Sequence, residues 1–248
     1  MKKMRLLAAG LLSMTMAKTD VAEEVVHSGN VIGVMAVETD KKATIAAVPF
    51  KDFDGGDMRL ANLVKTANLS EGDQLYRYDS AKGGFDGWVL NADSEGILRW
   101  EKCEKNFRLT GTGETASDNG TEADETMAVQ GAGIWLVRAN APSAPFVFYL
   151  QGTASDAEPM MVAAGTTGLL GNPTSSDATP TITGMSNGDT IQFATGGALL
   201  NVYTYNSMKG QWGYWDSENK PAWVDSPTVP AGIGFWYVSK GGVVTFAW

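Results

Sequence analysis

The chain has 248 residues, of which 44% are hydrophobic, and its net charge is −9 at pH 7. This length and apolar content suit one large or two small folded domains and exclude wholesale disorder. The acidic balance disfavours nucleic acids and anionic membrane surfaces as partners, because both present repelling phosphates. Cys103 is the only cysteine and His27 the only histidine, which excludes an intramolecular disulfide and a histidine-rich zinc site.

The N-terminus has the pattern of a secretory signal. Lys2, Lys3 and Arg5 form a basic head, residues 6–16 form an apolar run, and Ala17 offers a small residue for cleavage. The run is too short to span a bilayer, and the alternative interpretation is a buried N-terminal helix. The pattern predicts a signal peptide at 1–17 and a lead-in at 18–30. Cleavage would remove three positive charges, change the net charge from −9 to −12 and leave a soluble chain, secreted, periplasmic or at the cell surface.

The rest of the chain predicts short strands separated by turns, since 29 glycines accompany many β-branched and aromatic residues. A short helix is predicted over 58–65, because Asp57 can cap it and Leu60, Leu63 and Val64 fall on one face. Residues 104–126 predict an acidic loop and residues 153–159 a linker. The expected strands are 31–37, 44–50, 74–78, 85–90, 97–102, 127–129, 134–138 and 146–150, then 160–163, 168–171, 190–193, 198–205, 211–215, 222–224, 234–239 and 243–248.

An internal repeat is the strongest signal in the sequence. Residues 76–88 match residues 203–215 without a gap, at an offset of 127, with six identities in thirteen positions. Further on, 131–137 match 232–238 at an offset of 101, and Gly72-Asp73 matches Gly188-Asp189. The sequence therefore predicts an all-β fold of two tandem, related antiparallel modules at 31–152 and 160–248, each a sandwich or a small barrel.

The two-copy pattern GD…YxYDSxKGxWxxW…GxGFWYVS resembles that of a group of uncharacterised secreted β-rich proteins with two repeats, from Verrucomicrobia-like bacteria. The resemblance covers about residues 31–248, and its specificity lies in the Gly-x-Gly-Phe-Trp-Tyr-Val stretch and the Tyr-x-Tyr hairpin. It implies an exported bacterial protein with tandem modules. It implies no activity, no cofactor and no catalytic residue.

Residues with obvious catalytic chemistry are few. His27 lies in the predicted lead-in, so a Ser-His-Asp triad is not expected, and Cys103 has no histidine near it in sequence. Asp52, Asp54 and Asp57 have the oxygen spacing of a weak calcium loop, and the alternative is a turn that caps the short helix. A carboxylate pair acting on a glycoside is the remaining enzymatic option. Its candidates are Asp52, Asp54, Asp57, Asp73, Asp79 and Asp86.

Eight tryptophans need an explanation. Those shared by both copies in the expected register, Trp88 with Trp215 and Trp135 with Trp236, are interpreted as packing residues. Trp135 and Trp236 are accordingly expected to be largely buried and to occupy equivalent places. Tyr214 has no aromatic counterpart in the first copy. The candidate ligand surface, on which aromatic rings would stack against a sugar, is the cluster Trp212, Tyr214, Trp215 and Trp223.

Three functions follow from these observations. The first is an exported, non-enzymatic structural or adhesion protein at the cell surface or in the extracellular matrix. The second is carbohydrate binding through the aromatic cluster of the second copy, and the third, more remote, is a glycoside hydrolase. The expected partner is a protein or a glycan at the cell surface, with no nucleic acid, no membrane insertion of the mature chain and no cofactor.

Overall fold

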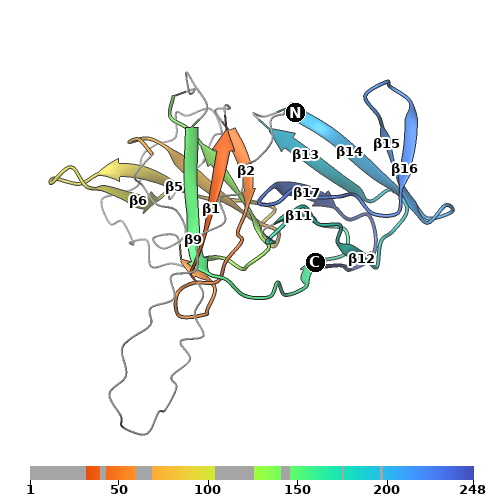
Figure 1. Cartoon of the computed structure of the whole chain (residues 1–248), viewed down its shortest axis with the longest axis horizontal. Coiled ribbons are helices and arrows are strands. Elements are labelled where there is room, and N and C mark those ends of the chain that lie inside the picture. Colours follow the sequence, from red (N-terminus) through yellow and green to blue (C-terminus); the bar gives the residue numbers. More distant parts are fainter. Residues whose placement is uncertain are drawn as a thin grey trace, which may run out of the picture.

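The computed structural model describes residues 32–39, 43–59, 69–103, 126–140, 146–174, 176–195 and 198–248, and within these ranges the fold is all-β (Figure 1). The predicted signal peptide at 1–17, the lead-in at 18–30 and residues 104–125 of the predicted acidic loop lie outside them. The described ranges contain no helix, so they also contain no helix that is long and apolar enough to cross a bilayer.

All predicted strands are confirmed to within three residues at either end. Two strands were not expected, β3 (Met58–Arg59) and β12 (Thr181–Thr183), which are too short to show alternation. The helix predicted over 58–65 is wrong for Met58 and Arg59, and residues 60–65 lie outside the described ranges. The other strands are β1 (Ile32–Thr39), β2 (Ala43–Ala47), β4 (Gln74–Asp79), β5 (Gly84–Ala92), β6 (Leu98–Lys102), β7 (Thr126–Ala128), β8 (Gly133–Val137), β9 (Phe146–Thr153), β10 (Met160–Val162), β11 (Thr167–Gly171), β13 (Thr190–Thr195), β14 (Ala198–Asn206), β15 (Gln211–Trp215), β16 (Pro221–Val224), β17 (Gly234–Val238) and β18 (Val244–Ala247).

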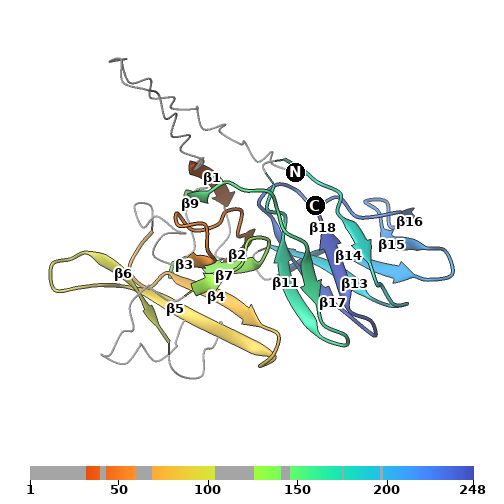
Figure 2. The ribbon, with the colours of Figure 1, turned by 90° about the horizontal axis from the view of Figure 1, so that it is seen from below.

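One open antiparallel sheet of eleven strands runs through the described part of both halves, in the order β16-β15-β14-β13-β2-β8-β4-β5-β6, with β17 beside β13 and β11 beside β17. The hairpins β5–β6 and β15–β16 lie at opposite ends of the molecule (Figures 1 and 2). Smaller sheets, β1-β9, β10-β18-β12 and β3-β7, complete the described fold.

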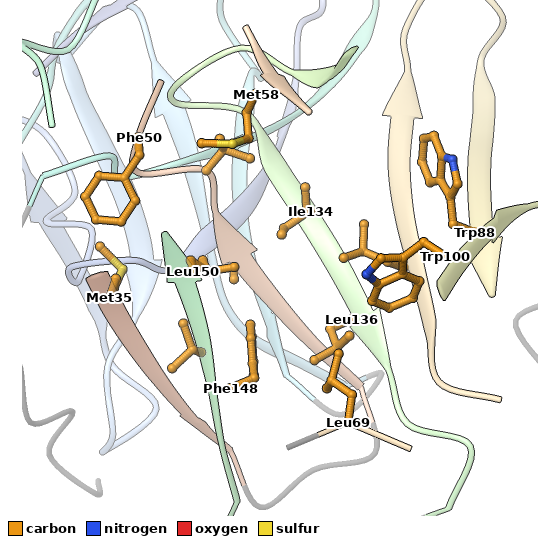
Figure 3. Close-up of a cluster of buried hydrophobic side chains, with 14 of the residues drawn as sticks. Met35, Phe50, Met58, Leu69, Trp88, Trp100, Ile134, Leu136, Phe148 and Leu150 are labelled. Carbon is orange, nitrogen blue, oxygen red and sulfur yellow. The ribbon is translucent and has the colours of Figure 1, made fainter. Parts of the chain in front are cut away.

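Each half buries one face of the large sheet under a smaller sheet. In the first half, Phe148 and Leu150 of β9 pack with Leu136 of β8 and with Trp88 and Trp100 of the outer hairpin (Figure 3). The second core is built in the same way: side chains of β10, β12 and β18 cover those of β13, β15 and β17. Alternation along each strand supplies these inward residues, so both cores follow from the period of two.

The strands around β8 and β17 are paired alike. β8 lies between β2 and β4, and Val137 faces Ala43 and Gln74. β17 lies between β11 and β13, and its corresponding residue Val238 faces Thr167 and Thr190. The offset of 101 between β8 and β17 in the sequence therefore also describes their places in the sheet.

Two buried aspartates hold the starts of β4 and β13. The Asp73 carboxylate accepts hydrogen bonds from the backbone N–H groups of Ser70 and Ala139, at 2.8 and 2.9 Å. At an offset of 116 from Asp73, the Asp189 carboxylate accepts a 2.8 Å bond from the Ser186 N–H. Both aspartates are completely buried.

Asp189 also accepts a hydrogen bond from the Lys240 N–H, as Asp73 does from the Ala139 N–H at the corresponding position. Their remaining partners differ: the Arg138 guanidinium lies 2.9 Å from Asp73, whereas the Tyr237 hydroxyl donates a 2.6 Å hydrogen bond to Asp189. Burial and then the bond to Asp189 raise the pKa of Tyr237 above its usual value.

The hairpins at 76–88 and 203–215 share a turn and differ in their place in the sheet. In both turns one side-chain oxygen, of Asp79 or of Asn206, accepts two backbone N–H bonds. However, β4 lies next to β8, whereas β14 is separated from β17 by β13. The sequence match at an offset of 127 therefore relates two similar turns, but the strands that it aligns do not occupy corresponding places in the sheet.

Backbone bonds give the register that does fit. Gly72 N–H donates to the carbonyl of Leu90, and Gly188 N–H donates to that of Tyr205, so β5 takes the place of β14. Leu90 faces Trp100 and Tyr205 faces Trp212. Trp100 is thus the counterpart of Trp212, and both are buried.

Several contacts between the halves are reciprocal. Ala47 N–H donates to the Gly232 carbonyl at 2.9 Å, and at the corresponding positions Gly171 N–H donates to the Gly131 carbonyl at 2.8 Å. Two isolated bridges, Ala46 with Ile233 and Ala132 with Leu170, are related in the same way. The strand pair that joins the halves, Thr44 of β2 with Thr195 of β13, has no such counterpart among the described strand pairs.

Glycine permits this close approach on both sides. A Cβ on Gly234 would lie 2.3 Å from Cγ2 of Ile45, and a Cβ on Gly133 would lie 2.7 Å from Cγ of Leu169. Both glycines face the opposite half, so any side chain at either position would push the halves apart.

Candidate aromatic binding site

The alternation of β15 divides the predicted aromatic cluster between two faces of the sheet. Gly213 and Trp215 share a face with Trp223 of β16, because Gly213 pairs directly with Trp223. Trp215 is 68% exposed and Trp223 is 38% exposed. Trp212 and Tyr214 point to the opposite face.

The opposite face belongs to the core of the second half. Trp212 is fully buried, and its ring lies 5.3 Å from that of Tyr205. Tyr214 is half-buried, with its ring 4.8 Å from that of Tyr203. The prediction that all four aromatics form one ligand surface is therefore wrong for Trp212, whose side chain no ligand can reach.

A groove lies over the exposed face of β14, β15 and β16. Its volume is about 560 Å³, and it includes the exposed tryptophans Trp215 and Trp223. No residue that lines it carries a charge. The lining is Asn187, Gly188, Val202, Thr204, Tyr205, Asn206, Gly213, Tyr214, Trp215, Pro221, Ala222 and Trp223.

Trp223 is fixed on both faces of its indole ring. A Cβ on Gly213 would lie 2.8, 3.0 and 3.2 Å from three neighbouring carbons of the six-membered ring. Such similar distances place the ring flat over Gly213 rather than edge-on to it. The ammonium of Lys209 lies 3.9 Å from the ring centroid, a cation–π contact on the face that Gly213 leaves open. Trp215 is the more accessible of the two rings.

The polar groups of the groove keep hydrogen-bonding capacity for a ligand. The side-chain oxygen of Asn187 accepts from Ser207 N–H at 3.1 Å, and that of Asn206 accepts from Met208 N–H at 3.0 Å. Within the described part of the chain, neither Asn uses its side-chain NH₂ group as a donor. Thr204, exposed on the same face, likewise makes no side-chain hydrogen bond to a described residue.

Most of the surface of Trp135 and of Trp236 is covered, as expected, but both lie outside the two hydrophobic cores, so their interpretation as core residues is wrong. Alternation turns their neighbours into the two cores and leaves the indoles on the other face of the sheet. There they meet from the two halves: Phe85 lies 6.0 Å from Trp135 and 5.8 Å from Trp236. Tyr78 lies 5.0 Å from Trp236 in a T-shaped contact. These aromatics join the halves rather than line the groove.

The calcium-loop candidates are occupied by a guanidinium. The Arg59 side chain lies 2.7 Å from the buried carboxylate of Asp52 and 3.2 Å from that of Asp54. Asp57 is exposed. Within the described ranges, no three side chains of the metal-binding types gather in one place.

The carboxylates considered for hydrolysis have other partners. Lys82 lies between Asp79 and Asp86, at 3.3 and 3.0 Å, and Arg77 also pairs with Asp86. The pKa of Asp79 is lowered, chiefly by the hydrogen bond from the Lys82 backbone. Burial opposes the shift at Asp86, but bonds from Arg77 and Lys82 still lower its pKa. A glycosidase needs one acid with a raised pKa, and this pair has none.

Cys103 is half-buried at the end of β6. Burial, and then the neighbouring Glu101, raise the pKa of its thiol to about 11. A nucleophilic cysteine requires the opposite shift.

Sequence reasoning matched Gly72-Asp73 with Gly188-Asp189 but did not predict that the two buried carboxylates bind backbone N–H groups. It also placed Trp215 among the packing residues through the register of 127. The chain matches no protein-family model, no curated protein and no solved structure, so its site is interpreted from its own geometry.

Proposed function

We propose that the protein is an exported, non-enzymatic adhesion protein that binds carbohydrate through the groove over β14, β15 and β16. The observation that carries this proposal is the pair of exposed tryptophans, Trp215 and Trp223, side by side on one sheet face within a groove of about 560 Å³. The indole of Trp215 offers an apolar face against which the C–H face of a pyranose can stack, with Trp223 beside it. Asn187, Thr204 and Asn206 supply the hydrogen bonds that fix orientation in such sites.

We further propose that the two halves are copies of one module. Three features support this: the like pairing of β8 and β17, the matching bonds of Asp73 and Asp189, and the reciprocal contacts between the halves. In the register of the sheet, Trp215 corresponds to Cys103 and not to Trp88. A tryptophan found in one copy only is not required by a shared fold, which frees it for a ligand.

Carbohydrate binding and adhesion are then one function. An exported protein with a glycan-binding groove would attach to polysaccharide at a cell surface or in a matrix. Two fused modules would give it one rigid body, because the large sheet is continuous between them.

The test is a glycan array followed by fluorescence titration of the intrinsic tryptophans. Trp215→Ala should lower affinity at least tenfold, a loss of about 1.4 kcal/mol or more. Met161→Ala is the matched control, because Met161 is an apolar side chain that is 71% exposed and lies outside this groove. Silence of the unmodified protein against every glycan would refute the proposal.

A further inference from the structure

We propose that the groove selects an uncharged oligosaccharide, with Trp215 as the ring that stacks on the sugar and Trp223 as a fixed side wall. This inference rests on the proposed carbohydrate binding. Beyond carbohydrate binding, it specifies that the ligand is uncharged and that the two tryptophans have different roles.

The absence of charge from the lining is the first argument. Charged residues make up 19% of the chain, yet none of the residues that line the groove is charged. A carboxylate or ammonium on a ligand would lose water there and find no opposite charge among them. An uncharged ligand loses less on entering such a site.

Nearby acids are already engaged. Asp225 accepts a 3.0 Å hydrogen bond from Gln211, whose backbone begins β15. Asp216 accepts bonds from the Glu218 and Lys220 N–H groups and so holds the β15–β16 turn. Both carboxylates hold the hairpin, and neither belongs to the lining of the groove.

Lys209 is the cation to consider as a partner for an acidic sugar, because it lies against a tryptophan of the groove. Its ammonium lies on the indole of Trp223, and no carboxylate of the described residues pairs with it. Its contact with Trp223 places it beside the groove rather than in its lining, and Lys209→Met tests whether it attracts an acidic sugar. With Gly213 on one face of Trp223 and Lys209 on the other, a sugar has Trp215 left to stack on.

The neutral polar groups fit a ligand rich in hydroxyls. The side-chain NH₂ groups of Asn187 and Asn206 can donate, and the Thr204 hydroxyl can both donate and accept. A purely apolar ligand would cover these groups without satisfying them, at a cost for each.

The size of the groove favours more than one sugar unit, because it extends over β14, β15 and β16 with a volume of about 560 Å³. Trp215 faces Pro221, and Trp223 faces Gly213, so the tryptophans form a diagonal cross-strand pair. Diagonal residues on neighbouring strands are separated by about 7–8 Å, which places Trp223 beside a sugar stacked on Trp215.

The experiment compares matched ligands. Cellohexaose, mannohexaose and laminarihexaose are each titrated by calorimetry beside the same hexamer oxidised at C6 to its uronate, at constant ionic strength. We expect at least one neutral hexamer to bind ten times more tightly than its oxidised form. Lys209→Met, which keeps the apolar stem and removes the charge, should leave that preference in place.

The outcomes separate the two proposals. Equal or tighter binding of an oxidised hexamer, lost in Lys209→Met, would make Lys209 an anion receptor and overturn this inference while carbohydrate binding stands. Equal or tighter binding that persists in Lys209→Met would overturn it as well. No binding of any hexamer, together with silence on the array, would remove the proposed function itself.

Discussion

Replacing Asp189 with Ala should be among the most damaging single changes in the second half. The carboxylate is fully buried and accepts hydrogen bonds from the Ser186 N–H, the Lys240 N–H and the Tyr237 hydroxyl. A hydrogen bond to a charged group contributes roughly 1.5–3 kcal/mol, and a buried donor left unpaired costs about 1–3 kcal/mol. Three such donors give an expected loss of about 4 kcal/mol or more, a large part of a typical domain's total stability.

Urea unfolding followed by tryptophan fluorescence and by circular dichroism would measure this loss. Asp156→Ala is the control, since Asp156 is exposed and makes no hydrogen bond to a described residue. Its free energy of unfolding should stay within about 0.5 kcal/mol of the parent. Asp73→Ala should resemble Asp189→Ala. If Asp189→Ala were within about 1 kcal/mol of Asp156→Ala, the proposed role of the buried carboxylate would be wrong.

Three further predictions follow. Gly234→Ala should lower the free energy of unfolding in urea by about 1–3 kcal/mol, because its Cβ would lie 2.3 Å from Cγ2 of Ile45. The double variant Gly234→Ala/Ile45→Ala should lose less stability than the sum of the two single losses. Strict additivity would contradict the close contact. With its pKa at about 11 rather than the usual 9.0, Cys103 should react with iodoacetamide about 100-fold more slowly in the folded protein at pH 8 than in urea, and equal rates would argue against a buried thiol. Because the native pKa of Asp86 is lowered, its ion pairs stabilise the fold above the ordinary carboxyl pKa and stop doing so as pH falls through the native value. Asp86→Asn should therefore lower Tm by about 2–4 °C at pH 7, with the difference shrinking below about pH 4, and a constant difference would contradict the assignment.

The strands could be predicted from the sequence because the period of two and the glycine-rich turns are local signals. β3 and β12 could not, since two or three residues show no period. The order of the strands in the sheet could not be predicted either, because it depends on contacts between residues far apart in the sequence. The hairpins at 76–88 and 203–215 fold into the same turn, yet the neighbour of β4 outside its hairpin is β8, whereas that of β14 is β13.

The candidate site was predicted only in part, because the sequence analysis did not use the alternation of side chains along β15. Of the four predicted residues, Trp215 and Trp223 lie exposed in the groove, and their role in binding stays a prediction. Counting Trp212 with them ignored the alternation of β15, which sends it into the core. The shared Gly-Asp dipeptide, rather than the hairpins, was the sequence feature that gave the register of the sheet, through Asp73 and Asp189.

The proposed two-copy arrangement also accounts for exposed tryptophans on β15–β16 that the hairpin β5–β6 lacks. In a symmetric dimer of separate, identical chains, every substitution appears twice, so a groove on one subunit is present on the other. When the two halves belong to one chain, a substitution in one half is not repeated in the other. The glycines that face the opposite half keep the two sides in contact, while the outer hairpin of each half can change alone. Here β15–β16 carries exposed tryptophans, and β5–β6 at the opposite end does not. In the proposed two-copy arrangement, the similar contacts therefore lie at the centre of the molecule and the differences at its ends.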